Sequence, residues 1–393
     1  MIIPKNVNKI LQKLNEAGFE AYIVGGCVRD CLLQRTPQDW DITTSATPQE
    51  VKKIFHKTYD TGLKHGTVTV ILEKEHYEIT TYRIEKEYYD CRHPSEVIFT
   101  KSLKEDLQRR DFTINAMAYH PKEGIQDYFC GQEHLKQKKI QGVGNPEERF
   151  QEDALRMLRA LRFSAQLGFD IEPKTYQALQ KQKKLIQKIS AERIHEELEK
   201  MLQAQFLEKI CFLWESGLLK EISPLLYQKM LSHGTEILQE LKNVSFDRIV
   251  RWVIFLQYLT AKEGEQLLKD LRFDNHSIKA IVMLLEHLKD EIPLQEYEIR
   301  KKACEMTPEQ LNRLFFIQGQ KKDTTKWIFY LEKILERKDC LTLKTLAVKG
   351  KDLQQIGING KEMGEVLSFL LDMVHKEPEK NKKQILLAAA KQK

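Results

Sequence analysis

The sequence of 393 residues lacks the short motifs that identify several large enzyme classes. It contains no GxxxxGK[ST] phosphate loop and no HExxH zinc motif. It also has no GxGxxG dinucleotide fingerprint, because Gly142-Val143-Gly144 lacks the third glycine. No His-Asp dipeptide occurs, which argues against an appended metal phosphohydrolase domain. These absences exclude the simplest P-loop, zincin and dehydrogenase assignments.

Paired cysteines and long apolar runs are missing as well. The seven cysteines form no CxxC pair, so we expect free thiols rather than a disulfide framework or a structural zinc site. The N-terminus MIIPKNVNKI lacks the apolar core of a signal peptide, and no run approaches the ~20 residues that span a bilayer. We therefore expect a soluble cytoplasmic protein with no membrane partner.

The charge balance is only mildly basic. The chain has 63 Lys and Arg against 57 Asp and Glu, a net charge of +6, which permits nucleic-acid binding without requiring it. The length predicts roughly two to four compact units. Function must therefore be sought in the placement of particular residues.

The most informative stretch reads GGCVRDCLLQRTPQDWDIT, residues 25 to 43. It opens with Gly25 and Gly26 after an apolar run and ends with Asp39 and Asp41 in a predicted short strand. Side chains at i and i+2 of a strand share a face, so both carboxylates would aim at one point. Two ionised carboxylates side by side repel each other, so their charge must be compensated by a cation, an arginine or bulk water. Hard oxygen ligands in small number suit Mg²⁺, and the glycines would let backbone amides approach a triphosphate. The alternative is a solvated strand end or turn.

This stretch, extended to Glu50, resembles the signature of the nucleotidyltransferase superfamily in its tRNA branch, the class II CCA-adding enzymes and their poly(A) polymerase relatives. The resemblance is strongest over residues 21 to 200. It implies an α+β fold, in which a nucleotidyltransferase head with a small mixed β-sheet and helices precedes an all-α neck, body and tail. We place these parts at residues 1–146, 147–212, 213–300 and 301–393.

Local patterns predict the elements of the head. Apolar spacing predicts a helix over residues 8–17, a strand over 19–24 and a helix that starts at Thr47-Pro48-Gln49-Glu50. Residues 65–72 and 77–82 are rich in β-branched side chains and are predicted to pair as strands. Glu78 on the second of these is a candidate third acidic group near the aspartates; the alternative is a solvent-facing strand glutamate.

Residues 83 to 101 are charged and aromatic with one proline, which predicts a mobile loop. Asp90-Cys91-Arg92-His93-Pro94 resembles the DGRHP of the flexible loop in class II enzymes. In that family the loop is tied to switching from C to A addition, so its presence counts against an enzyme that adds only C.

Residues 109 to 118, RRDFTINAMA, resemble the second motif of the family. The resemblance implies that Arg110, Asp111 and Asn115 handle the ribose and phosphates of the incoming nucleotide, for which Asp and Asn supply acceptors and donors. The alternative is a basic helix end that feeds a structural strand. The predicted nucleotide-binding residues are Gly25, Gly26, Arg29, Arg110, Asp111, Asn115, Glu152, Asp153, Arg156, Arg159 and Arg162.

From Pro146 onward the apolar period becomes helical. One helix over residues 149–163 is predicted, with Leu155, Leu158 and Leu161 facing a core and with Asp153 and Arg156 on one face. The EDxxR motif of the family falls on Glu152, Asp153 and Arg156. Cytosine and adenine both offer an amine beside a ring-nitrogen acceptor, which a carboxylate and a guanidinium match; uracil and guanine present the reverse order. The alternative is an ordinary ion pair within the helix.

Segments after the EDxxR motif give less information about function. The segment from Ser190 to Ile194 opens a helix that resembles a supporting motif of the family, and Trp214, Trp252 and Trp327 are expected in cores. The glycine-containing segments between Gly350 and Gly364 resemble the tail of class II enzymes, which contacts the outer corner of tRNA; the alternative is plain turns between helices.

We therefore predict template-independent addition of CCA to the 3′ end of tRNA from CTP and ATP, with Mg²⁺ on Asp39 and Asp41. The partner is tRNA, bound at its acceptor end and elbow. The alternatives are an A-adding enzyme, a poly(A) polymerase and a non-catalytic RNA-binding protein. His65-Gly66-Thr67-Val68-Thr69-Val70 favours the CCA type over the polymerases.

Overall fold

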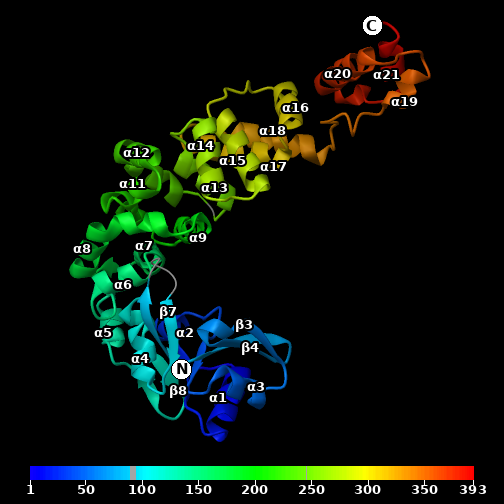
Figure 1. Cartoon of the computed structure of the whole chain (residues 1–393). Helices are drawn as coiled ribbons and strands as arrows, with labels where there is room; N and C mark the ends of the chain where they lie inside the picture. The colour runs from blue at the N-terminus through cyan, green and yellow to red at the C-terminus, as the bar shows by residue number, and fades with distance from the viewer. Residues whose placement is uncertain (89–93, 245) are drawn as a thin grey trace. The chain divides into compact units, whose positions relative to one another are not determined.

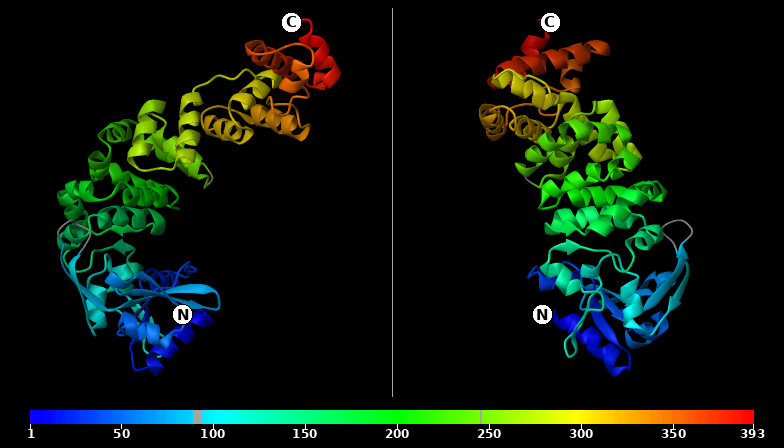
Figure 2. Two further views of the ribbon diagram at one scale, coloured as in Figure 1. Left: turned by 45° about the vertical axis from the view of Figure 1, so that its right-hand side comes forward. Right: turned by 90° about the vertical axis from the view of Figure 1, so that its left-hand side faces the viewer.

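The computed structural model describes residues 1–88, 94–244 and 246–393 (Figure 1). Contacts divide the chain into two compact units, Met1–Leu238 and Gln239–Lys393. All strands of the described residues lie in the first unit, and the second is helical (Figure 2). The predicted α+β class is confirmed. The predicted edges after residues 146, 212 and 300 stay predictions.

A mixed seven-stranded sheet organises the first unit. Its order is β3 (Thr58–Gly62), β4 (Thr67–Leu72), β5 (Glu75–Thr81), β2 (Ile42–Thr44), β1 (Ala21–Val24), β8 (Ala118–His120) and β9 (Gly124–Gln126). All neighbours run antiparallel except β2 and β5. The central strands β1 and β2 are buried along their whole length, which explains their uninterrupted apolar and threonine side chains.

The predicted helices of the head are present, although α1 starts three residues before the predicted segment 8–17. Helix α1 (Lys5–Glu16) buries Ile10, Leu11 and Leu14 and gives way to Gly18 at φ +86°. Helix α3 (Pro48–Ile54) starts with a full capping box between Thr47 and Glu50. The other helices of the head are α2 (Gly26–Leu32), α4 (Leu103–Gln108) and α5 (Gly131–Lys136).

The predicted loop over residues 83 to 101 is wrong for most of its length. It contains β6 (Arg83–Tyr88) and β7 (Pro94–Phe99), an antiparallel pair in which Ile84 faces Ile98. The charges that suggested a loop are compensated instead, since Glu85 pairs with Arg83 at 2.7 Å and with Arg109 at 3.6 Å. The proline is the first residue of its strand, where the missing N–H is tolerated. Residues 89–93, which carry the DGRHP-like segment, lie outside the described residues.

The predicted single helix over residues 149–163 is also wrong. Helix α6 (Pro146–Glu152) ends before Asp153, whose backbone is extended at φ −141° and ψ 103°, and α7 (Leu155–Leu167) begins after it. The carboxylate of Asp153 accepts a hydrogen bond from the Leu155 N–H at 3.1 Å. A local side-chain bond of this kind competes with helix continuation, which explains the break.

Helices α8 (Pro173–Gln182), α9 (Ala191–Leu202), α10 (Phe212–Glu215), α11 (Leu218–Ile222) and α12 (Pro224–Lys242) follow α7. Strands β10 (Lys139–Ile140) and β11 (Asp170–Ile171) pair beside them. Ser190 occupies the N-cap position of α9 as predicted, but its side chain makes no capping bond. Trp214 is buried, as expected.

The second unit contains α13 (Arg248–Leu256), α14 (Ala261–Asp270), α15 (Asn275–His287), α16 (Glu296–Glu305), α17 (Pro308–Gln318), α18 (Thr325–Glu336), α19 (Gly350–Gln354), α20 (Lys361–Lys376) and α21 (Lys383–Ala390). Trp252 is fully buried against Phe255 and Phe273. Trp327 is half-buried and donates to the carbonyl of Ile292 at 2.8 Å. Across the described residues, no helix combines the length and apolar character of a membrane span.

Candidate active site

The ends of two central strands bring the glycine turn and the aspartate pair together. Strand β1 runs antiparallel to β2, and the N–H of Val24 donates to the carbonyl of Asp41 at 3.0 Å. Gly25 follows directly, with φ +84°, and an ideal Cβ there would lie 4.0 Å from Asp41 Oδ2. The two halves of the first motif therefore meet at one end of the sheet.

The prediction that Asp39 and Asp41 lie within a strand is wrong in detail, because β2 begins at Ile42. The chain leaves the sheet at Gly25 after β1, so residues 39 and 40 have no neighbouring β1 backbone to pair with. The aspartates stand at the entry to β2.

Glu78 lies beside this pair. Strand β5 runs parallel to β2 with Ile79 opposite Ile42, and the same register brings Glu78 level with Asp41. All three carboxylates line a cavity of about 1020 Å³. Burial raises the pKa of Glu78, and the charges of Asp41 and Asp39 raise it further. The predicted proximity of Glu78 to the aspartates is therefore confirmed, while its catalytic role stays a prediction.

The aspartate pair carries charge that the protein does not neutralise by contact. Burial raises the pKa of Asp41, the charge of Arg110 lowers it, and the charge of Asp39 raises it further. Asp41 is nevertheless exposed to solvent, because it lines two open cavities. In the described part of the chain, no ion pair joins either aspartate to Lys, Arg or His. A hard divalent cation fits this donor set.

The same described residues hold no group of three His, Cys, Asp or Glu side chains that could bind a metal by themselves. Two protein carboxylates with remaining positions left for water and substrate oxygens are what Mg²⁺ commonly uses. The pair therefore suits a metal that arrives with a phosphate-bearing substrate.

A second cavity of about 610 Å³ borders the aspartates on a basic side. Its lining includes Gly26, Arg29, Arg35, Asp39, Asp41, Arg162 and Lys200. Asp30 also lines it and pairs with Arg29 at 2.8 Å. Carboxylates and basic side chains in one cavity provide for a metal and for an anionic ligand close together.

Asp106 ties the second motif to this site. It is fully buried, pairs with Arg109 at 2.7 Å and Arg110 at 3.6 Å, and accepts from the hydroxyl of Thr43 at 3.2 Å. Arg110 in turn lies 3.0 Å from an ideal Cβ at Gly25, so the absence of a side chain there leaves room for it. The sequence reasoning missed Asp106, although its spacing of three and four residues from the arginines was a usable signal.

A chain of polar contacts then connects the head to the helices after it. Asn115 accepts from Arg29 Nη1 at 2.6 Å and donates to Asp111 at 3.1 Å. Asp111 accepts from Arg159, and Glu197 on α9 pairs with Arg162 at 2.6 Å. Although burial alone would raise it, Arg159 and Asn115 hold the pKa of Asp111 down at about 2. The structure thus brings five predicted nucleotide-binding residues from three segments, together with Glu197 of α9, into one network.

Phe163 supports the arginines of this network. The guanidinium carbons of Arg29, Arg159 and Arg162 lie 5.1, 5.2 and 4.1 Å from its ring centroid. Cation–π attraction to one ring holds three positive groups close together before any anion binds. Neither Phe163 nor Glu197 stood out in the sequence, because the contacts of Phe163 with Arg29 and of Glu197 with Arg162 join different helices.

The residues expected to read the base are held by separate partners. Asp153 pairs with Arg193 of α9 at 2.8 Å. Arg156 pairs with Glu152 at 2.5 Å and donates to the carbonyl of Arg109 at 2.8 Å. The alternative of an ion pair between Asp153 and Arg156 is therefore wrong, because the helix breaks between them.

Comparison with known proteins covers most of the chain. Residues 21–141 match the Poly A polymerase head domain, 168–230 the RNA and SrmB-binding site of polymerase A, and 246–390 the tRNA nucleotidyltransferase domain 2. The CCA-adding enzyme of Enterococcus faecalis is 38% identical, over 98% of this chain and 95% of that protein. That of Pediococcus pentosaceus is 40% identical, over 98% and 97%. This chain belongs to the CCA-adding enzyme family. The resemblance seen in the motifs is confirmed, and with it the assignment as a tRNA nucleotidyltransferase.

A solved structure agrees with this placement. The Bacillus stearothermophilus CCA-adding enzyme in complex with CTP superposes with a TM-score of 0.84 at 32% identity, covering 100% of this chain and 99% of the other. The fold of this chain thus has a counterpart over nearly the whole of a CCA-adding enzyme.

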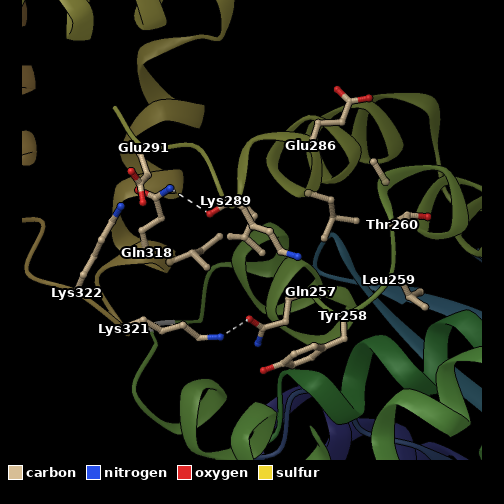
Figure 3. A pocket seen from close by; sticks show the side chains of 14 residues that line it. Gln257, Tyr258, Leu259, Thr260, Glu286, Lys289, Glu291, Gln318, Lys321 and Lys322 are labelled. Carbon is tan, nitrogen blue, oxygen red and sulfur yellow. Dashed lines mark hydrogen bonds between the residues drawn. The ribbon is translucent and has the colours of Figure 1, made fainter. Parts of the chain in front are cut away.

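A further cavity of about 570 Å³ lies in the second unit (Figure 3), and we compared it with the site in the head as a candidate active site. Lys321 donates to Gln257 at 3.2 Å and Gln318 donates to the carbonyl of Leu288 at 3.1 Å. These donors are satisfied by the protein itself, whereas the aspartate pair of the head is not. The catalytic chemistry of a CCA-adding enzyme is therefore best sought in the head.

Proposed function

We propose that this chain adds CCA to the 3′ end of tRNA from CTP and ATP, without a template, and releases pyrophosphate. The observation that carries the proposal is the position of the unneutralised Asp39 and Asp41 beside a cavity lined by guanidinium groups. Family membership supports the same reaction.

Asp39 and Asp41 would hold Mg²⁺. When bound, this ion activates the attacking 3′ hydroxyl and stabilises the charge of the leaving pyrophosphate. Asp39 and Asp41 line the same two cavities, so their negative charges attract a cation together. Glu78 adds negative charge next to the pair and is proposed as a third catalytic carboxylate.

The protein's own positive groups would bind the triphosphate. Arg29 and Arg162 line the basic cavity, and Arg110 lies next to Gly25. Asn115 and Asp111 fix Arg29 and Arg159, so the guanidinium groups are oriented before substrate arrives. Gly25 and Gly26 leave the backbone open to close approach.

Asp153 and Arg156 would read the base. A carboxylate accepts from the amine of cytosine or adenine, and a guanidinium donates to the neighbouring ring nitrogen. Uracil and guanine would leave both groups mispaired, which is a strong basis for rejection. Replacing either residue with alanine is expected to relax selection against UTP and GTP; unchanged discrimination in both variants would contradict this role.

The deciding experiment extends three transcripts of one tRNA, ending before CCA, after C and after CC, with CTP and ATP in Mg²⁺. We expect CCA on the shortest transcript and no further addition. Extension of only the CC-ended transcript would indicate an A-adding enzyme, and a long A tail would indicate a polymerase. Binding of tRNA without any extension would contradict an enzymatic role.

A further inference from the structure

We propose that Tyr59 is the platform on which the last base of the tRNA 3′ end stacks, so that the 3′ hydroxyl lies at Asp39 and Asp41. This inference rests on the proposed addition of nucleotides to tRNA. It goes beyond that proposal because it assigns the attacking strand to the second cavity at the aspartates. It also names a residue outside the predicted nucleotide-binding set.

The two cavities at the aspartates differ in charge, although Asp39 and Asp41 line both. The smaller one, of about 610 Å³, is the basic cavity. The larger one, of about 1020 Å³, is lined by Glu75 and Glu78 in addition to the aspartates, and its described lining includes no lysine or arginine. A triphosphate carries several negative charges, so it is attracted to the basic cavity and repelled from the larger one.

The geometry of the reaction then gives the larger cavity a substrate of its own. In an in-line displacement, the attacking and leaving oxygens lie on opposite sides of the phosphorus. When the leaving pyrophosphate lies among the guanidinium groups of the basic cavity, the attacking hydroxyl must come from the opposite side. The larger cavity is on that side of the aspartates, because their carboxylates border both cavities.

One row of residues crosses the sheet from the aspartates to Tyr59. Glu78 of β5 lies level with Asp41 and directly opposite Thr69 of β4, and Thr69 lies opposite Tyr59 of β3. Directly opposite residues share a face, so Tyr59, Thr69 and Glu78 stand on the face that lines the larger cavity. Three strand spacings separate the backbones of Tyr59 and Asp41 by about 14 Å. One nucleoside and the two side chains together can fill that span.

The surroundings of Tyr59 suit a nucleoside. Tyr59 is 60% exposed, and its side chain lines the cavity together with the half-buried Trp40. An exposed aromatic ring in a nucleic-acid site provides a stacking surface worth about 1–3 kcal/mol per base. The hydroxyls of Thr61 and Thr69, 2.8 Å apart, give the same cavity polar groups that can meet a ribose.

Stacking also matches a substrate whose end changes during the reaction. The strand ends before CCA, then after C and then after CC, and each end has to reach the same carboxylates. An aromatic platform accepts all of them, because every base has a π-face. Recognition of the terminal base by hydrogen bonds would favour one of these ends over the others. A tyrosine at this position therefore fits an enzyme that extends several different ends.

The test is a cycle that changes the protein and the substrate in turn. Tyr59→Ala in the full chain is combined with ligated tRNA whose last nucleotide either carries or lacks its base, and kcat/KM for the tRNA is measured with saturating CTP. We expect Tyr59→Ala to lower kcat/KM for the intact tRNA by about tenfold. It should have little effect on the tRNA that lacks the terminal base. Tyr59→Phe keeps the ring and should behave like the unaltered chain.

Two controls separate stacking from general damage. The KM for CTP should stay unchanged in Tyr59→Ala, because Tyr59 is not part of the described lining of the basic cavity. Tyr128→Ala removes another exposed tyrosine of the head, which is not among the described residues lining either cavity. This variant should leave kcat/KM for both tRNAs unchanged.

An equal loss on both tRNAs would overturn the proposal, because the effect would then not depend on the terminal base. An unchanged kcat/KM in Tyr59→Ala would overturn it too, as would a rise in the KM for CTP that accounts for the whole loss. These outcomes leave the proposed function intact as long as the unaltered chain adds CCA to intact tRNA. If the unaltered chain extends none of the tRNAs, the proposed function fails and this inference fails with it.

Discussion

Arg159 donates two hydrogen bonds to a single oxygen of Asp111, from Nε at 2.8 Å and from Nη2 at 2.7 Å. The bond joins α7 to the second motif of the head across 48 residues of sequence. Asp111 also accepts from Asn115 and from the N–H of Phe112, so its carboxylate is satisfied on every side by donors. A residue expected to face the nucleotide therefore also holds two parts of the first unit together.

The low pKa of Asp111 predicts a defined loss of stability in acid. Its pKa of about 2 lies below the ordinary 3.8, so ionised Asp111 stabilises the fold at pH values above 3.8. That stabilisation, about 2 kcal/mol, is lost as the pH falls through the native value near 2. We expect Asp111→Asn to lack this part of the pH dependence in the free energy of unfolding measured from pH 5 to 2.

Asp60→Asn is the matched control, because Asp60 makes only an exposed pair with Lys52. Such pairs contribute about 0–1 kcal/mol, so the acid limb of the curve should change little. An Asp111→Asn variant whose curve ran parallel to that of the unaltered chain would contradict the stabilising role of the carboxylate.

Asp41→Ala is expected to lower nucleotide incorporation by more than about 10²-fold, because it removes one of two metal-binding carboxylates. Binding of tRNA should persist, since the cavity next to Asp41 keeps its guanidinium groups. Incorporation of labelled CTP and a filter-binding assay with tRNA measure the two quantities separately. Full activity in this variant would refute the metal-site assignment.

Glu78→Gln tests the contribution of the third carboxylate separately from that of Asp39 and Asp41. It removes a charge that lies level with Asp41 while keeping the size of the side chain. We expect a smaller decrease in rate than for Asp41→Ala, accompanied by a higher Mg²⁺ requirement because the local negative charge is reduced. Titration of the incorporation rate against Mg²⁺ checks this, and an unchanged titration curve would assign Glu78 to the solvent-facing alternative.

Gly25→Ala should impair nucleotide binding as well as stability. Its backbone, at φ +84° and ψ −134°, lies in a region essentially restricted to glycine, where another residue costs about 1–3 kcal/mol, and the added methyl would press on Arg110 at 3.0 Å. We expect a lower melting temperature together with a raised KM for CTP.

Gly124→Ala is the comparison, because Gly124 has a similar φ of +78° but no atom within 4 Å of its ideal Cβ. Both variants should lose stability, and only Gly25→Ala should change the KM for CTP. An equal KM in the two variants would mean that displacement of Arg110 has no effect on nucleotide binding.

Local patterns in the sequence predicted the elements of the head with good accuracy. The apolar run of β1, the capping box of α3 and the β-branched pair β4 and β5 each depend on neighbours within a few residues, and all are present. The secondary structure of charged segments was harder to predict. β6 and β7 looked like a loop, since the arginines that compensate Glu85 were not identifiable from the segment itself.

The sequence by itself determined the family, the aspartate pair, the glycine turn and the identity of most groups around the site. Each of these features depends on residues that lie only a few positions apart in the sequence, so it can be recognised without the fold. Only the tertiary structure decided which arginine meets which carboxylate. Arg29 reaches Asn115 across 86 residues and Arg193 reaches Asp153 across 40, while Asp153 and Arg156, three apart, do not pair. The physical reason is that an ion pair depends on which helix faces are packed together and on where a helix breaks, and neither is set by the distance between two residues along the chain.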